Sequence, residues 1–199
     1  MADDAPVAVN HPDAFDFTPE FDLPSFMGTW HITHTTLPAR KSIQNLTITY
    51  TPLPGSTTRF TEHTAHPSTE PTRVTPKPAV AAGTNTAAVA PTPTHFTRRG
   101  AGLGRLLASP WQVLAFVSSD ENATPDTDLA YAVVYAPRTR FAPARLDVLS
   151  RAPTGLPRAL LAALLARLRD ADAVGPDVAR LAVGLFEVPR TGVRTSPRS

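Results

Sequence analysis

Short segments in which apolar and polar residues alternate run through most of the chain. Such alternation places one face of a β-strand against a core and the other toward solvent. Prolines and glycines separate the segments, as at 52–55, and favour turns there. The segments that alternate, or that are rich in β-branched and aromatic residues, are 28–36, 42–51, 57–64, 95–100, 111–119, 129–136 and 144–150. The pattern predicts an all-β domain.

The pattern changes to a helical one after residue 156. Pro157 suits a first helical turn, and Gly175-Pro176 marks a stop. A final strand is expected at 181–188. Many short strands with one helix favour a sandwich or a barrel, and a barrel leaves no exposed sheet edge. The apolar stripe of the helix is Leu160, Leu161, Leu164, Leu165 and Leu168.

Three segments lack this regularity. Residues 1–24 are acidic and contain proline, so we expect an arm with little regular structure. Residues 67–94 hold six prolines and only three large apolar residues, all valine, which indicates a long insertion with at most a weak strand near 72–75. Residues 189–199 form a basic tail that we expect to be disordered. The folded domain is therefore expected over 25–188.

Composition narrows the class of protein. Hydrophobic residues make up 42% of the 199 positions, enough for one core, and the 22 prolines favour short strands over long helices. The absence of cysteine excludes disulfides and cysteine-based metal sites. We find no apolar run long enough for a signal peptide or a membrane span. The expectation is a soluble cytoplasmic protein.

The net charge of +2 is distributed unevenly. Residues 1–22 hold six acids and no lysine or arginine, so this segment carries −6 and the remainder +8. An acidic arm lying on a basic body is one interpretation, and a solvated tail is the simpler one. The arginines are scattered and are not interleaved with exposed aromatic residues, which argues against nucleic-acid binding.

Metal and phosphate sites find little support. His31 and His34 are three residues apart on an expected strand and therefore lie on opposite faces, as do His63 and His66, so neither pair can chelate one metal. The glycine-rich run 100–104 lacks the strand–loop–helix context of a phosphate loop. We expect no metal and no cofactor.

Three motifs in order resemble those of the lipocalins. Gly28-Thr29-Trp30 is a G-x-W at the start of the first strand, and Asp126-Thr127-Asp128 looks like the T-D motif that opens a lipocalin's seventh strand. Leu149-Ser150-Arg151 ends the eighth strand and precedes the helix. The likeness is to small intracellular lipocalin-like (calycin) proteins of filamentous fungi. It implies an antiparallel up-and-down β-barrel of about eight strands with one C-terminal helix packed outside.

The resemblance also implies roles for the motif residues. In the family, Trp30 would close the barrel floor and Arg151 would lie across its indole in a cation–π contact. Leu146 and Val148 would face outward, beneath the leucine stripe of the helix. The residues expected to be structural are Gly28, Trp30, Asp128 and Arg151.

Strand alternation then predicts the side chains that face the interior. Pairing Trp30 with Arg151 on neighbouring strands would set His34 opposite Asp147. That pair has three interpretations: mutual stabilisation, recognition of the polar end of a ligand, or acid–base chemistry. The expected ligand-binding positions are Ile32, His34, Thr36, Leu46, Ile48, Phe60, Phe116, Arg145 and Asp147.

Two functions fit such a barrel. The first is binding, sequestration or transport of a small hydrophobic molecule, such as a fatty acid, pigment or secondary metabolite. The second is a cyclase or isomerase that holds an apolar secondary-metabolite intermediate in a reactive conformer, with His34 and Asp147 as catalytic candidates. A third, an interaction module that uses the acidic arm, predicts an empty cavity.

Overall fold

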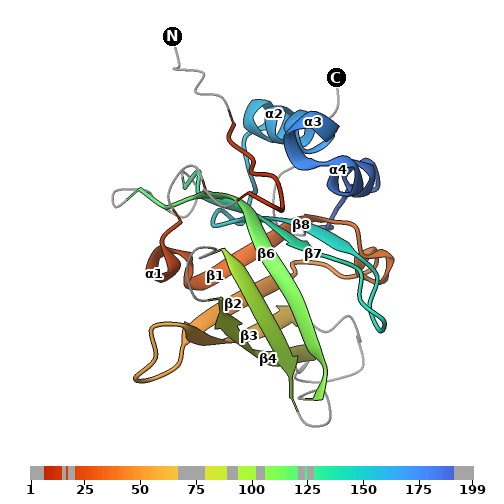
Figure 1. Cartoon of the computed structure of the whole chain (residues 1–199). Helices are drawn as coiled ribbons and strands as arrows, with labels where there is room; N and C mark the ends of the chain where they lie inside the picture. Colours follow the sequence, from red (N-terminus) through yellow and green to blue (C-terminus); the bar gives the residue numbers. More distant parts are fainter. Residues whose placement is uncertain are drawn as a thin grey trace.

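The barrel closes because β1 pairs with β2 along one edge and with β8 along the other (Figure 1). The structure is a computed structural model that describes residues 7–14, 17, 21–66, 79–88, 94–101, 106–120, 124 and 128–190. Within these ranges each strand from β1 to β8 runs antiparallel to the next. They are β1 (Gly28–Thr35), β2 (Thr47–Pro52), β3 (Arg59–His66), β4 (Ala79–Ala87), β5 (His95–Gly100), β6 (Ala108–Val117), β7 (Tyr131–Ala136) and β8 (Arg145–Ser150).

Short elements extend the barrel at both ends. The helix α1 (Leu23–Phe26) precedes β1 at the end where that strand begins, which we call the closed end. The 3-10 helix η1 (Pro38–Arg40) lies in the β1–β2 loop at the opposite, open end. A ninth strand, β9 (Phe186–Glu187), pairs with His34 and Thr35 and so continues the edge of β1 beyond the point where β2 leaves it.

Helices cover the outer face of β6, β7 and β8 (Figure 1). In the described stretch 151–190 they are α2 (Arg158–Leu168), α3 (Ala171–Val174) and α4 (Pro176–Val183). Leu164 and Leu168 of α2 are fully buried, and Leu146 and Val148 of β8 lie beneath the helices, as predicted. No helix in the described part of the chain is long and apolar enough to cross a membrane.

The expected final strand at 181–188 is wrong over most of its length. Residues 181–183 belong to α4, and only Phe186–Glu187 form a strand. Pro176 is fixed near helical φ at the start of α4. Val178 and Ala182 are then buried at a helical spacing of four, so the apolar residues pack as a helical face and not as a strand.

The expected insertion 67–94 contains the strand β4, so its description as largely irregular is wrong for 79–87. The strand has a weak sequence signal because it is composed mostly of alanine, threonine and glycine. Pairing with β3 on one side and β5 on the other supplies its backbone hydrogen bonds. The weak strand expected near 72–75 and the tail beyond residue 190 lie outside the described residues.

Part of the acidic N-terminal segment packs on the barrel, so a solvated tail is the wrong expectation for its described residues. Val9 is buried in the apolar cluster that the helices form with β6, β7 and β8, and the backbone N–H of Asn10 donates to the carbonyl oxygen of Leu114 at 2.7 Å. Phe21 enters the barrel core at the closed end and lies 5.2 Å from Phe116 between ring centroids. Apolar residues that lie between the acidic ones thus anchor this segment to the barrel.

Candidate ligand-binding site

The closed end of the barrel is sealed around Trp30. The Arg151 guanidinium carbon lies 3.7 Å from the centroid of the indole, the contact expected from the sequence. Arg151 also donates to the carbonyl oxygens of Ser25 and Thr29, each at 2.8 Å. A Cβ at Gly28, where φ is +98°, would lie 3.0 Å from Arg151 Nη1, so this position requires glycine.

Asp128 fixes the entry to β7. Its Oδ1 accepts from the backbone N–H of Ala130 at 2.9 Å, and its Oδ2 accepts from the hydroxyl of Ser119 at 2.7 Å. The carboxylate therefore ties the end of β6 to the start of β7, which fits the structural role predicted for this residue.

Aromatic rings fill the closed half of the barrel interior. Phe96 and Trp111 stack with centroids 4.3 Å apart, and Phe26 stacks on Tyr50 at 4.9 Å. Trp30 Nε1 donates to the carbonyl oxygen of Phe26 at 2.8 Å, so the buried indole N–H is paired. The rings of this cluster, which we call the aromatic floor, belong to Phe21, Phe26, Trp30, Tyr50, Phe60, Phe96, Trp111 and Phe116.

A cavity of about 610 Å³ occupies the open half, above the aromatic floor. Apolar side chains from the β1–β2 loop, β6 and the β7–β8 loop form much of its wall, and charged residues complete it. Apolar residues of the lining include Leu37, Ile43, Leu46, Pro110, Trp111 and Ala136. The charged ones are Arg40, Glu62, Arg98 and Arg145.

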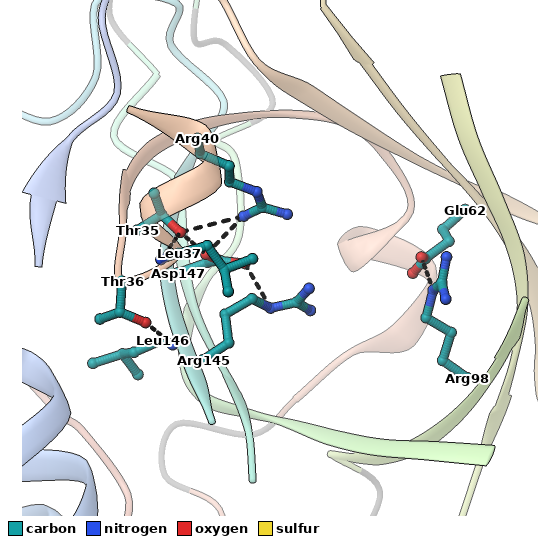
Figure 2. A network of polar contacts seen from close by, with 9 residues as sticks. All are labelled: Thr35, Thr36, Leu37, Arg40, Glu62, Arg98, Arg145, Leu146 and Asp147. Atoms are coloured by element: carbon teal, nitrogen blue, oxygen red, sulfur yellow. Dashed lines mark hydrogen bonds and ion pairs between the residues drawn. The ribbon is translucent and has the colours of Figure 1, made fainter. Parts of the chain in front are cut away.

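Asp147 holds two arginines at one side of this cavity (Figure 2). Its Oδ1 accepts from Arg40 Nη1 at 2.8 Å and from the Thr35 hydroxyl at 2.6 Å. Its Oδ2 lies 3.1 Å from Arg145 Nε. The Thr35 hydroxyl in turn accepts from the backbone N–H of Leu37 at 3.2 Å, which anchors the loop that carries Arg40.

A second ion pair lies across the interior (Figure 2). Arg98 Nε donates to Glu62 Oε1, and Asn85 Nδ2 donates to Glu62 Oε2 at 3.2 Å. Asn85 Oδ1 accepts from Trp111 Nε1 at 2.8 Å, which links the ion pair to the aromatic floor. A Cβ at Gly83 would lie 3.0 Å from Arg98 Nε, so glycine leaves the space that the guanidinium occupies.

The predicted pairing of His34 with Asp147 is wrong. The register of β1 and β8 follows the prediction as far as Ile32 opposite Leu149 and then shifts at a β-bulge, so His34 faces Val148 and Thr35 faces Asp147. An extra residue in one strand moves the following side chains to the other face. Thr35 therefore takes the inward place that His34 was expected to fill.

His34 lies instead beside β9 on the outside of the barrel. Its Nδ1 is 3.3 Å from the Thr33 hydroxyl. Burial lowers the pKa of His34, with Glu187 raising it and Arg190 lowering it further. Burial and Arg190 also lower the pKa of His31. Both imidazoles are thus disfavoured as cations, and neither reaches the large cavity.

Only some of the other predicted ligand positions lie at the cavity. Leu46 and Arg145 line the cavity, and Asp147 lies at its wall through Arg145. Ile48, Phe60 and Phe116 are inside the barrel but belong to the packed core. Ile32 lines a smaller pocket of about 220 Å³ next to His31 and Arg190. Thr36 does not line the cavity, and its hydroxyl accepts from the backbone N–H of Leu146 at 2.9 Å.

Sequence reasoning missed Arg40, Glu62, Arg98 and Trp111. Glu62 and Arg98 follow Phe60 and Phe96 by two residues on their strands, so alternation from an inward aromatic residue could have found them. Arg40 lies in a loop, where no periodicity applies. No group of three histidine or acidic side chains suited to a metal occurs in the described part of the chain.

Comparisons with known proteins show a similarity in fold and none in sequence family. No family model and no curated protein matches the sequence. Among solved structures, apocrustacyanin C2 has a TM-score of 0.58 at 13% identity, covering 94% of this chain and 93% of that one. Lobster apocrustacyanin A1 has a TM-score of 0.53 at 14% identity, covering 93% and 91%. Per a 4, a major allergen from cockroaches, has 0.54 at 12% identity, covering 92% and 96%.

These likenesses define the class of fold. A closed, eight-stranded, antiparallel up-and-down barrel with C-terminal helices packed outside is the lipocalin fold. The fold class predicted from the motifs is therefore confirmed, and the described stretch 151–190 forms three helices where one was expected. The structural neighbours are themselves lipocalin and calycin proteins.

Proposed function

We propose that the protein binds a small, largely apolar molecule in the open half of the barrel and sequesters or carries it. The observation that carries this proposal is the cavity of about 610 Å³, whose size lies within the usual range for small-molecule sites of about 300–1,000 Å³. Leu37, Ile43 and Leu46 offer an apolar wall to the body of a ligand, and Trp111 contributes an aromatic side chain to the lining.

Binding is favoured over catalysis by the positions of the candidate acid and base. The enzymatic alternative depends on His34 and Asp147 acting on one substrate, but His34 lies on the outer side of the bulge. Asp147 Oδ1 accepts from Arg40 and from the Thr35 hydroxyl, and Oδ2 lies 3.1 Å from Arg145 Nε, so both carboxylate oxygens already have protein partners. Neither group is therefore placed to exchange a proton with a molecule in the cavity.

Titration with N-phenyl-1-naphthylamine, an uncharged apolar fluorophore, tests the proposal. We expect its fluorescence to rise on binding to the wild type. Ala136→Trp places a large ring at a cavity-lining position and should weaken binding at least about tenfold by occupying the space. Ala163→Trp, the same substitution at an exposed position on α2, is the control and should bind like the wild type. Absence of binding by the wild type, or equal binding by both variants, would contradict the proposal.

A further inference from the structure

The arginine cluster at Asp147 carries more positive than negative charge. Arg40 and Arg145 share the single Asp147 carboxylate, and their side chains are only 12% and 27% exposed. Across the cavity, Arg98 and Glu62 balance each other. The charged residues that the structure describes at the cavity, together with Asp147, are three arginines and two carboxylates. They carry an excess of one positive charge beside an apolar wall, where an uncompensated charge is costly.

The two arginines also have hydrogen-bond donors to spare. Each guanidinium has five N–H groups. Arg40 uses Nη1 for Asp147 and Thr35, and Arg145 approaches Asp147 through Nε alone. Within the described part of the chain, Arg40 Nη2 and both terminal nitrogens of Arg145 have no protein partner, and the buried Arg145 Nε lies near Asp147 without forming a hydrogen bond. Figure 2 shows both guanidiniums extending past Asp147 into the space that separates them from Glu62 and Arg98.

We infer that the bound molecule is an acid, and that Arg40 and Arg145 bind its carboxylate while its apolar body lies against Leu46 and Trp111. This inference rests on the proposed function. A planar carboxylate matches the forked donors of a guanidinium, and such charge-assisted bonds are stronger than neutral ones. One monoanion balances the single excess charge, whereas a phosphate dianion would leave a new excess of negative charge.

The surrounding residues fix where the acid group binds. Thr35 and Asp147 hold Arg40, and the backbone N–H of Leu37 bonds to Thr35, so the β1–β2 loop is tied to the cluster. On the opposite side, Glu62 would repel a second carboxylate. The site therefore selects a molecule with one acid group at the Asp147 side and an uncharged remainder.

A matched ligand pair tests the inference. Dodecanoic acid and methyl dodecanoate differ in charge but have nearly the same apolar body, and each can be competed against N-phenyl-1-naphthylamine near neutral pH. We expect the wild type to bind the acid at least about tenfold more tightly than the ester, the size of one charge-assisted interaction. Arg145→Gln should remove most of this preference, by weakening binding of the acid much more than binding of the ester. Arg145→Lys should keep part of it, because the charge remains but the fork is lost.

Arg138→Gln is the matched control, since it removes the same charge from an exposed position in the loop that precedes Arg145. It should keep the preference for the acid. Equal affinities for acid and ester in the wild type, or equal losses in Arg138→Gln and Arg145→Gln, would overturn the inference but leave the proposed function standing. If the fluorophore and both compounds fail to bind the wild type, the proposed function falls and the inference falls with it.

Discussion

The two halves of the barrel interior are built from opposite kinds of side chain on the same strands. On β3 the step from Phe60 to Glu62 passes from the aromatic floor to an ion pair, and on β5 the step from Phe96 to Arg98 does the same. On β8, Leu149 lies in the core and Asp147 in the arginine cluster. Two residues along a strand span about 7 Å, so the change from apolar to charged occurs within one layer of side chains.

This difference assigns the two halves different tasks. In the closed half the rings pack against one another and the indole N–H groups of Trp30 and Trp111 are paired, so that half is complete by itself. In the open half, donors of Arg40 and Arg145 remain unused, and an excess charge borders an apolar wall. The closed half thus stabilises the fold, and the open half is the part that a ligand would complete.

Removing the centre of the aromatic floor should have the largest effect. Trp30 is fully buried, and Trp30→Ala would leave a cavity, remove the face on which Arg151 lies and cost roughly 3–5 kcal/mol of unfolding free energy. Trp30→Phe keeps an aromatic ring and loses the bond to Phe26, so it should cost less. Urea denaturation measures both. A neutral Trp30→Ala would mean that the floor does not depend on this ring.

Removing the carboxylate of the open half should have a smaller effect. Asp147→Asn leaves Arg40 and Arg145 without a counter-charge, and breaking a buried ion pair costs roughly 3–5 kcal/mol. We expect a loss of about 2–3 kcal/mol, below that range, because Arg145 is 27% exposed. Asp172→Asn on α3, an exposed carboxylate, is the control in the same urea denaturation experiment. Equal losses in the two variants would show that the arginines do not need Asp147.

Much of the closed half could be predicted from the sequence. The resemblance of the motifs to those of lipocalins implies Trp30 at the floor and Arg151 across it, and alternation places Leu146 and Val148 outside. The first two positions follow from the family resemblance, and the last two follow from the period of two along a regular strand. The strand β4 was not predicted, because pairing with its neighbours stabilises it and its own composition gives no strand signal.

The open half was harder to predict because irregular backbone builds it. Arg40 reaches Asp147 from a 3-10 turn in a loop, and no sequence period indicates that approach. The bulge between Ile32 and His34 exchanges the inward positions of His34 and Thr35. A bulge inserts one residue without a composition signal in this strand, so alternation counted from Trp30 holds for two residues and then fails.

The same bulge leads to the smallest predicted effect. It places His34 between β8 and β9, where burial lowers its pKa from 6.5, and Glu187 only partly offsets this. With the folded pKa below the unfolded one, the unfolded chain binds more protons between the two values. The contribution of His34 to stability is therefore full above about pH 6.5 and is lost as the pH falls through 6.5 toward the folded value.

Urea denaturation at about pH 7.5 and about pH 5.5 separates this effect from general acid destabilisation. We expect the wild type to lose more stability on acidification than His34→Gln, which has no imidazole to protonate at this position. His63→Gln, on an exposed face of β3, is the control and should follow the wild type. If His34→Gln and the wild type lose the same stability, His34 does not have a lowered pKa. The opposite result would overturn the inward position of Thr35. If His34 faced Asp147, its pKa would be raised, and its contribution to the stability of the protein would increase on acidification.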